Sequence, residues 1–247
     1  MTDTPPSTNT TAPADEVLGV IIGRAGSQGL PGKNALDLGG RPVVAWTIDD
    51  ALEARTVGRV IVSTDCPRVA AAATAAGVGV VDRPTELAGP TVTVDAVVRH
   101  AVGSAGSHAG LIVILYANVP ARPDGLIDRA VEHLVETGAD SVQSYADVGK
   151  HHPWWMVRLD DAGRVEPFIE NTVHRRQDLP PLLIPDGGVI AVRRRSLFTV
   201  VDGQPHAFLG ADRRGIVSQP GAVIDIDGPE DFELARARLT TASGVGT

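Results

Sequence analysis

The sequence predicts a three-layer, Rossmann-like α/β fold with a mainly parallel central sheet, and two observations support that prediction. Apolar β-branched runs recur along the chain, and alanine-rich amphipathic stretches of helical length lie between them. Strands that alternate with helices in this way form mainly parallel sheets with helices on both faces. The chain has 247 residues, of which 43% are hydrophobic, so it is long enough to bury a substantial core.

The elements follow one another in a regular order along the first part of the chain. We expect strands at residues 17–22, 57–64, 77–81 and 110–116, with later strands at 187–192 and 222–227, while residues 139–145 begin a second, less regular region. We expect helices at residues 43–54, 67–76, 92–102 and 125–137, and a final helix at 229–239. Residues 149–186 are rich in proline, aromatic and basic residues and show little periodicity. A long irregular stretch in a compact domain is usually functional or disordered, so we expect a substrate lid or a dimerisation segment there.

The two ends of the chain differ in composition from residues 17–239, which we expect to form one domain. Residues 1–16 are rich in Thr and Pro and lack an apolar signal-peptide core, which predicts a disordered leader. The sequence of residues 240–247, TTASGVGT, predicts a flexible tail. No stretch approaches the ~20 apolar residues that a membrane span needs.

Charge and cysteine content argue against several classes of protein. The net charge of -8 disfavours a general nucleic-acid-binding surface, although a few concentrated basic residues can still bind a nucleotide. The single cysteine, Cys66, excludes an intrachain disulfide framework and fits a reducing compartment. We therefore expect a cytoplasmic protein with no membrane or nucleic-acid partner.

The strongest local feature is a glycine-rich loop, IIGRAGSQGLPGKN at residues 21–34, which begins at the end of the first expected strand. Its glycines permit close backbone approaches, and consecutive free N–H groups in such a turn can surround a phosphate. Arg24 and Lys33 would add charge-assisted hydrogen bonds to the phosphate oxygens. The spacing matches neither the Walker A loop nor the dinucleotide fingerprint. The loop therefore predicts a phosphate site of another kind, with a solvated glycine turn as the alternative.

A pair of acids near the C-terminus suggests a metal site. Asp225 and Asp227 lie in VIDIDGPEDF, residues 223–232, and alternation along the expected strand would place both on the same side. Two carboxylates suit Mg²⁺, which binds through one or two carboxylates together with substrate phosphates. The alternative is that Asp227 caps the helix that Gly228 and Pro229 open.

The glycine-rich loop resembles the signature of the CMP-sugar synthetases, the acylneuraminate and related cytidylyltransferases, which typically reads like PARGGSKGIPLKN. The matching residues are Arg24, Gly26, Ser27, Gly29, Pro31, Lys33 and Asn34, while Gln28 stands where a lysine is common. Five later segments resemble further blocks of the family in the same order: residues 62–65, 83–97, 115–123, 174–192 and 223–232. The resemblance covers residues 17–239 and implies a nucleotidyltransferase fold of the GT-A-like type.

The resemblance implies a role for each block. The residues implied in nucleotide binding are Gly23, Ala25, Gly26, Ser27, Gln28, Gly29, Asn34 and Arg83, with Arg83 near the cytosine ring. Arg24, Lys33 and Asp227 are implied in catalysis, and Asp225 and Asp227 in holding Mg²⁺. The residues implied at the sugar are Tyr116, Asn118, Arg175, Arg176, Gln177 and Asp186. The two arginines would clamp a carboxylate, because guanidinium matches its geometry bidentately.

The activity implied is the transfer of CMP from CTP to a sialic-acid-like 2-keto-3-deoxy sugar acid, with release of pyrophosphate, by a homodimer. Some residues depart from the family pattern: Pro90 replaces an acid, Val92 and Val94 replace small or hydroxyl residues, and Tyr116 and Asn118 replace Gln and Thr. Two other functions remain open. One is a nucleotidyltransferase of the same fold that uses a sugar phosphate, and the other is a non-catalytic nucleotide- or sugar-binding relative.

Overall fold

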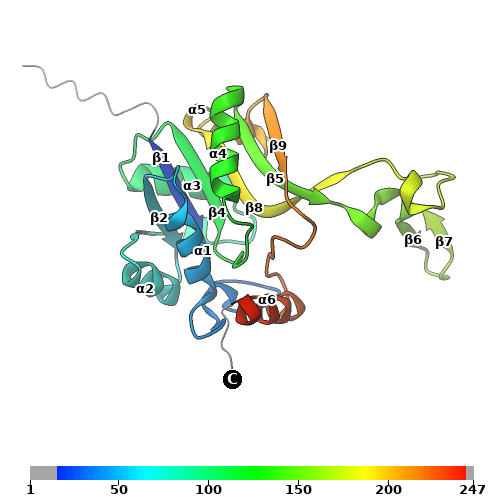
Figure 1. Ribbon diagram of the computed structural model, residues 1–247, viewed down its shortest axis with the longest axis horizontal. Helices are drawn as coiled ribbons and strands as arrows, with labels where there is room; N and C mark the ends of the chain where they lie inside the picture. The colour runs from blue at the N-terminus through cyan, green and yellow to red at the C-terminus, as the bar shows by residue number, and fades with distance from the viewer. Residues whose placement is uncertain (1–15, 243–247) are drawn as a thin grey trace, which may run out of the picture.

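The fold is built on one seven-stranded sheet with the spatial order β3-β2-β1-β4-β8-β5-β9 (Figure 1). In the computed structural model, which describes residues 16–242, the strands are β1 (Val17–Ile22), β2 (Arg59–Thr64), β3 (Gly79–Asp82), β4 (Leu111–Tyr116), β5 (Ser141–Asp147), β8 (Leu183–Arg193) and β9 (Arg213–Val217). The first four strands are parallel, β8 runs antiparallel to β4 and β5, and β9 is parallel to β5. The predicted mainly parallel sheet is confirmed.

Helices cover both faces of the sheet, as the sequence predicts. One face packs against α1 (Val43–Glu53), α2 (Pro67–Ala75) and α4 (Leu126–Thr137). The other face packs against α3 (Val94–Ser104) and the short α5 (Arg194–Leu197). Along β1, Ile21 belongs to the first of these cores and Val20 to the second. A strand that is covered on both sides must be apolar throughout, which explains the run VLGVII.

The last helix, α6 (Pro229–Ala242), packs outside these layers. It belongs to a third, smaller core with Leu38, Ile224 and Ile226. Because α6 extends to Ala242, residues 240–242 of the predicted tail are helical. The rest of the tail and residues 1–15 of the predicted leader lie outside the described residues. Within residues 16–242, no helix has both the length and the apolar character needed to cross a membrane.

The expected strand at residues 222–227 is wrong. These residues form no sheet strand, and their one bridge pairs Ala121 with Ile224. The backbone N–H of Ile224 donates to Ala121 O, and that of Ile226 donates to Asn118 O, at 3.1 and 2.9 Å. The alternating pattern of the segment therefore reflects docking on the loop after β4, with both isoleucines buried. The edge position in the sheet belongs to β9, which the sequence analysis did not predict.

The irregular stretch predicted at residues 149–186 forms a projecting arm, which we define as residues 148–182. Strands β5 and β8 still pair at Asp147 and Leu183, where the arm begins. The arm carries short 3-10 turns and an antiparallel hairpin of β6 (Val157–Leu159) and β7 (Val165–Pro167). Figure 1 shows the arm extending away from the sheet and its helices.

Candidate active site

A cavity of about 450 Å³ lies at the carboxyl ends of β1, β3 and β4, where ligands bind in open α/β sheets. Eleven of the predicted site residues line it: Gly23, Arg24, Ser27, Gln28, Gly29, Lys33, Asn34, Arg83, Tyr116, Asn118 and Asp227. The structure therefore brings together the glycine-rich loop, the segment after β3, the end of β4 and one of the two acids.

Close packing fixes the glycine-rich loop at two of its glycines. A Cβ on Gly23 would lie 2.6 Å from the Cβ of Ala117, and one on Gly29 would lie 2.3 Å from the carbonyl oxygen of Asp227. Both approaches require glycine, since real Cβ atoms do not come so close. A Cβ on Gly26, by contrast, would meet nothing within 4 Å.

Asp65 also holds the loop, and the sequence analysis did not assign it a role. Its Oδ1 accepts a hydrogen bond of 2.8 Å from the backbone N–H of Ala25. The predicted site residue Ala25 is thereby tied to the end of β2. The signal that could have revealed Asp65 was its place in VSTD, directly after an apolar strand.

Three positive side chains, those of Arg24, Lys33 and Arg83, line this cavity. Nη1 of Arg24 donates to Gly89 O at 3.0 Å, which joins the loop to the segment after β3. Arg83 is buried, and its Nη2 donates to Ser63 O at 2.7 Å. Burial lowers the pKa of Arg83; the charge of Asp65 partly opposes this shift, and the charge of Arg24 adds a smaller decrease. Like charges held so close favour an anionic ligand.

Asn34 presents an unmatched hydrogen-bond acceptor at the cavity. The residue is only 5% exposed, and its Nδ2 donates to Arg24 O at 3.0 Å. Its Oδ1 is buried and has no hydrogen-bond partner among the described residues. An unsatisfied buried polar atom costs about 1–3 kcal/mol. A donor group on a bound ligand would recover that free energy.

The two acids adjoin the cavity. Nζ of Lys33 donates to Asp227 Oδ1 at 2.7 Å and to Ile226 O at 2.6 Å. The side-chain amide of Asn118 donates to Asp225 Oδ1 and, at 3.0 Å, to Ile226 O. Burial, followed by the charge of Asp227, raises the pKa of Asp225 to about 6. Burial and the charge of Asp225 also raise the pKa of Tyr116.

The donor set of these acids fits a hard divalent cation that shares its coordination with a phosphate. The raised pKa of Asp225 reflects burial first and the charge of Asp227 second, and a bound cation would favour the ionised carboxylate against both. Within residues 16–242, no group of three or more His, Cys, Asp or Glu side chains is arranged to hold a metal. Mg²⁺ matches this donor set, because it binds through one or two carboxylates plus substrate phosphates and water.

The remaining predicted site residues do not line the cavity. Arg175, Arg176 and Gln177 lie on the arm, at the turn η5 (Arg176–Asp178). Arg175 pairs there with Asp178 at 2.6 Å. Asp186 lies on β8, and its carboxylate accepts hydrogen bonds from Ser144 and Ser218. Within one chain, these four residues are therefore not among those that line the cavity.

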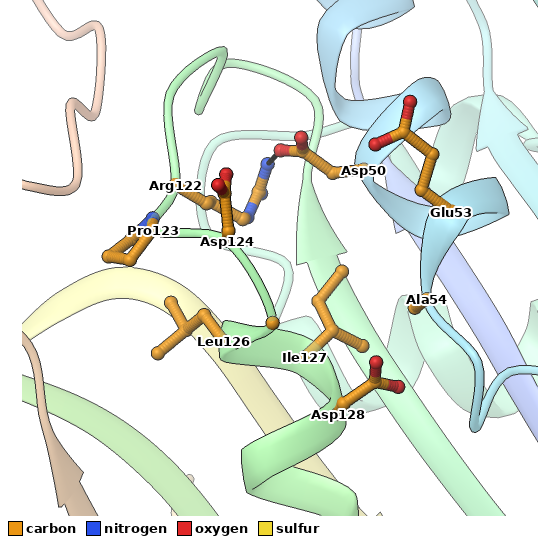
Figure 2. A pocket seen from close by; sticks show the side chains of 10 residues that line it. Asp50, Glu53, Ala54, Arg122, Pro123, Asp124, Leu126, Ile127 and Asp128 are labelled. Carbon is orange, nitrogen blue, oxygen red and sulfur yellow. Dashed lines mark hydrogen bonds and ion pairs between the residues drawn. The ribbon is translucent and has the colours of Figure 1, made fainter.

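Arg122, which the sequence analysis assigned no role, supports the loop after β4 (Figure 2). Its side chain is 2% exposed and points toward Asp50 on α1, with Nη1 and Oδ2 3.0 Å apart. It also donates to Gly188 O at 2.7 Å and to Val119 O at 2.6 Å. One guanidinium therefore joins α1, β8 and the loop that carries Asn118, beside a small cavity of about 140 Å³. The signal for it was an arginine shortly after a buried strand, in a segment that resembles a family block.

Comparison with known proteins assigns the chain to a family. The family model described as Cytidylyltransferase matches residues 18–153, which is more than half of the chain. The chain belongs to the cytidylyltransferase family. That match covers the glycine-rich loop, Arg83 and the end of β4.

Individual relatives agree with this family. An N-acylneuraminate cytidylyltransferase of Streptococcus agalactiae serotype V is 30% identical over 188 residues, which are 73% of this chain and 45% of the relative. Its counterpart in Escherichia coli O18:K1:H7 is 29% identical over 224 residues, 89% of this chain and 51% of the relative. The chain thus spans about half the length of these curated relatives.

Solved structures show the same fold. A CMP:2-keto-3-deoxy-manno-octonic acid synthetase, solved in complex with CTP, superposes with a TM-score of 0.71 at 18% identity. That alignment covers 92% of this chain and 99% of the other. HddC from Yersinia pseudotuberculosis, in complex with GMP-PN, gives a TM-score of 0.61 at 15% identity, covering 91% of this chain and 99% of the other.

Proposed function

We propose that this chain activates a sialic-acid-like 2-keto-3-deoxy sugar acid by transferring CMP to it from CTP. The anomeric hydroxyl oxygen attacks the α-phosphorus, the bond to the β-phosphate oxygen breaks, pyrophosphate leaves and the hydroxyl proton is released. The observation that carries the proposal is one cavity that Arg24, Lys33, Arg83 and Asp227 line together, with Asp225 hydrogen-bonded to the lining residue Asn118. N-acylneuraminate cytidylyltransferases among the relatives support the choice of both substrates.

The nucleotide would occupy the cavity with its phosphates on the glycine-rich loop. Arg24 and Lys33 would bind phosphate oxygens through charge-assisted hydrogen bonds. The base would lie between Arg83 and an apolar wall that includes Val92 and Val94. Oδ1 of Asn34 would accept a hydrogen bond from the ligand. Positioning and charge neutralisation supply most of the catalysis in reactions of this kind.

Asp225 and Asp227 would hold Mg²⁺ together with the phosphates. When bound, the ion would neutralise phosphate charge and lower the pKa of a coordinated hydroxyl. The protein holds these acids through Asn118, which hydrogen-bonds Asp225, and Lys33, which pairs with Asp227. Tyr116, at the end of β4, and Asn118, in the loop that follows, also line the cavity and would face the sugar acid.

The direct test is pyrophosphate release in the presence of Mg²⁺. CTP, UTP, ATP and GTP would each be combined with sialic-acid-like acids, shorter 3-deoxy sugar acids and a sugar phosphate. We expect release with CTP and one class of sugar acid, and a loss of about 10²-fold or more in Asp225→Ala. Release only with the sugar phosphate would instead identify a different acceptor. Nucleotide binding without any release would identify a non-catalytic relative.

We further propose that the active form is a homodimer in which the arm of each chain reaches the partner. The arm exposes large apolar side chains: Trp155, Met156, Val157, Leu159, Val165, Phe168 and Ile169. Large exposed apolar patches mark interaction surfaces. A second copy seated on the arm would cover them. It would also carry Arg175 and Arg176 toward the sugar acid of the partner, which they do not reach within their own chain.

A charged substitution on the arm tests the dimer. Leu159 is 66% exposed and lies opposite Val165 in the hairpin, so the single change Leu159→Glu places no second charge across from it and should leave the fold intact. We expect a monomer by light scattering and at least a tenfold higher KM for the sugar acid, with CTP affinity unchanged. Val135→Glu, at a position on α4 that is 57% exposed, is the matched control and should remain dimeric. A monomeric, fully active wild type would contradict the proposal.

We also propose a cytoplasmic location. The single cysteine fits a reducing compartment, where CTP is available as a substrate. Cell fractionation with an antibody to the chain would check it.

A further inference from the structure

The segment between the arm and Asp225 contains a turn to which the proposed reaction assigns no role. Strand β8 passes from the arm into the sheet through Asp186, Gly187 and Gly188. At this point its pairing with β5 shifts register, between Gln143 and Tyr145. Such bulges redirect side chains and are common next to active sites. Ser144, the residue within this shift, is fully buried.

Both oxygens of the Asp186 carboxylate accept hydrogen bonds from other groups of the protein. Its Oδ1 accepts hydrogen bonds from Ser144 Oγ at 2.5 Å and from the backbone N–H of Gly188 at 2.9 Å. Its Oδ2 accepts a hydrogen bond from Ser218 Oγ, and Ser218 is only 3% exposed. These donors come from β5, from β8 and from the segment after β9. Asp186 therefore fixes the turn rather than facing the cavity.

Gly187, directly after Asp186, lies against Asp225. Its φ is +77°, and a Cβ at this position would lie 2.9 Å from Asp225 Oδ2. The other oxygen of Asp225, Oδ1, is held by the amide of Asn118. The loop after β4 thus holds Oδ1 of Asp225, and the turn in β8 passes so near Oδ2 that a Cβ on Gly187 would crowd it.

We propose that Asp186 is a positioning residue for Asp225, acting through Gly187, and not a substrate contact. This inference rests on the proposed function, because the position of Asp225 matters through the divalent cation that it would share with the nucleotide. Asp186 sets the backbone of the turn, and the bare backbone of Gly187 leaves room for the carboxylate in its cation-binding position. Because β8 continues into the arm, the same turn connects the arm to Asp225.

Gly187→Ala tests the contact with Asp225. We expect its Cβ to displace the carboxylate and to raise the dissociation constant for Mn²⁺ at least tenfold, measured by electron paramagnetic resonance with CTP and no sugar acid. CTP affinity measured in EDTA should change less than threefold. Gly138→Ala is the matched control, because its φ is +69° and a Cβ there meets nothing within 4 Å. It shares the backbone strain, and we expect Mn²⁺ binding to stay at the wild-type level.

Two substitutions of Asp186 distinguish a positioning role from direct contact with the substrate. Neither of them alters Gly187. An asparagine keeps an acceptor for Ser144 and Gly188 and can donate to Ser218, whose hydroxyl also lies 3.3 Å from Tyr145 O. We therefore expect Asp186→Asn to keep wild-type Mn²⁺ affinity and sugar-acid KM, and Asp186→Ala to weaken Mn²⁺ binding at least tenfold. Thermal unfolding of each variant confirms that it is folded at the assay temperature.

The outcomes distinguish this inference from the proposed function. If the wild type shows neither CTP-dependent Mn²⁺ binding nor pyrophosphate release, the proposed function is wrong and the inference falls with it. If the wild type is active but folded Gly187→Ala or Asp186→Ala binds Mn²⁺ normally, only the inference is overturned. A sugar-acid KM that rises tenfold in Asp186→Asn, with Mn²⁺ binding unchanged, would also overturn it, because the charge would then act on the substrate.

Discussion

Lys33→Met is expected to reduce pyrophosphate release about 10²- to 10³-fold, the usual cost of losing one electrostatic contact to the transition state. The side chain of Lys33 is 15% exposed and bridges Asp227 Oδ1 and Ile226 O. Its charge therefore lies where the phosphates and the acids would meet. Methionine keeps the length and packing of the stem but removes the charge. The measurement is turnover at saturating CTP and sugar acid.

The free protein supplies a second readout for the same substitution. Without nucleotide, Lys33 neutralises Asp227, so the ammonium and a divalent cation compete for one carboxylate. We expect Lys33→Met to bind Mn²⁺ more tightly than the wild type when CTP is absent, even though its turnover is low. Arg129→Met, at an exposed position on α4, should alter neither quantity. Undiminished turnover in Lys33→Met would contradict the proposed phosphate contact.

Arg122→Met is expected to lower the free energy of unfolding by about 3 kcal/mol, the lower end of the usual cost of removing one partner of a buried ion pair, because Asp50 is 32% exposed. The change leaves Asp50 without its cation and deprives Gly188 O of this donor, whereas Val119 O keeps its hydrogen bond from the Thr47 hydroxyl. Burial already raises the pKa of Asp50 despite the nearby guanidinium, so an unpaired carboxylate there would be costly. Domains of this kind have only about 5–15 kcal/mol of total stability.

Urea unfolding followed by circular dichroism measures this effect. The same Arg129→Met control removes an arginine from the surface and should change the free energy of unfolding by less than about 0.5 kcal/mol. A loss below about 1 kcal/mol in Arg122→Met would show that the loop after β4 keeps its place without the guanidinium. The structural role given to Arg122 would then be wrong.

The layers of the fold were predictable because their signals are local. Strands β1, β2 and β4 are nearly continuous apolar runs, since helices cover both faces, and the helices between them are amphipathic. Strand β9 escaped prediction because its sequence, RRGIV, is that of an exposed edge strand and lacks an apolar run. The prediction of a strand at residues 222–227 was wrong for the opposite reason. Their alternation is that of a strand, but their partner is a loop.

The candidate site was predictable where one contiguous motif ends a strand. The glycine-rich loop, Arg83 and Asn118 are of this kind, and all line one cavity. The position of Arg175 depends on the path of β5 and β8 out of the sheet, which no local pattern encodes. The role of Asp186 depends on two buried serines that are 42 and 32 residues away along the chain. A carboxylate that long-range donors have satisfied cannot be told from a free one in sequence.

Because of the close approach of Gly29 to the carbonyl of Asp227, we expect the glycine-rich loop to depend on the C-terminal part of the domain. The glycine-rich loop rests on backbone that the chain supplies only near its other end, where a Cβ would be 2.3 Å from that oxygen. A fragment limited to residues 18–153, the span of the family match, would keep the loop but lose its support and both acids. Fragment libraries and split reporters of this protein should therefore recover function only when the two pieces reassemble.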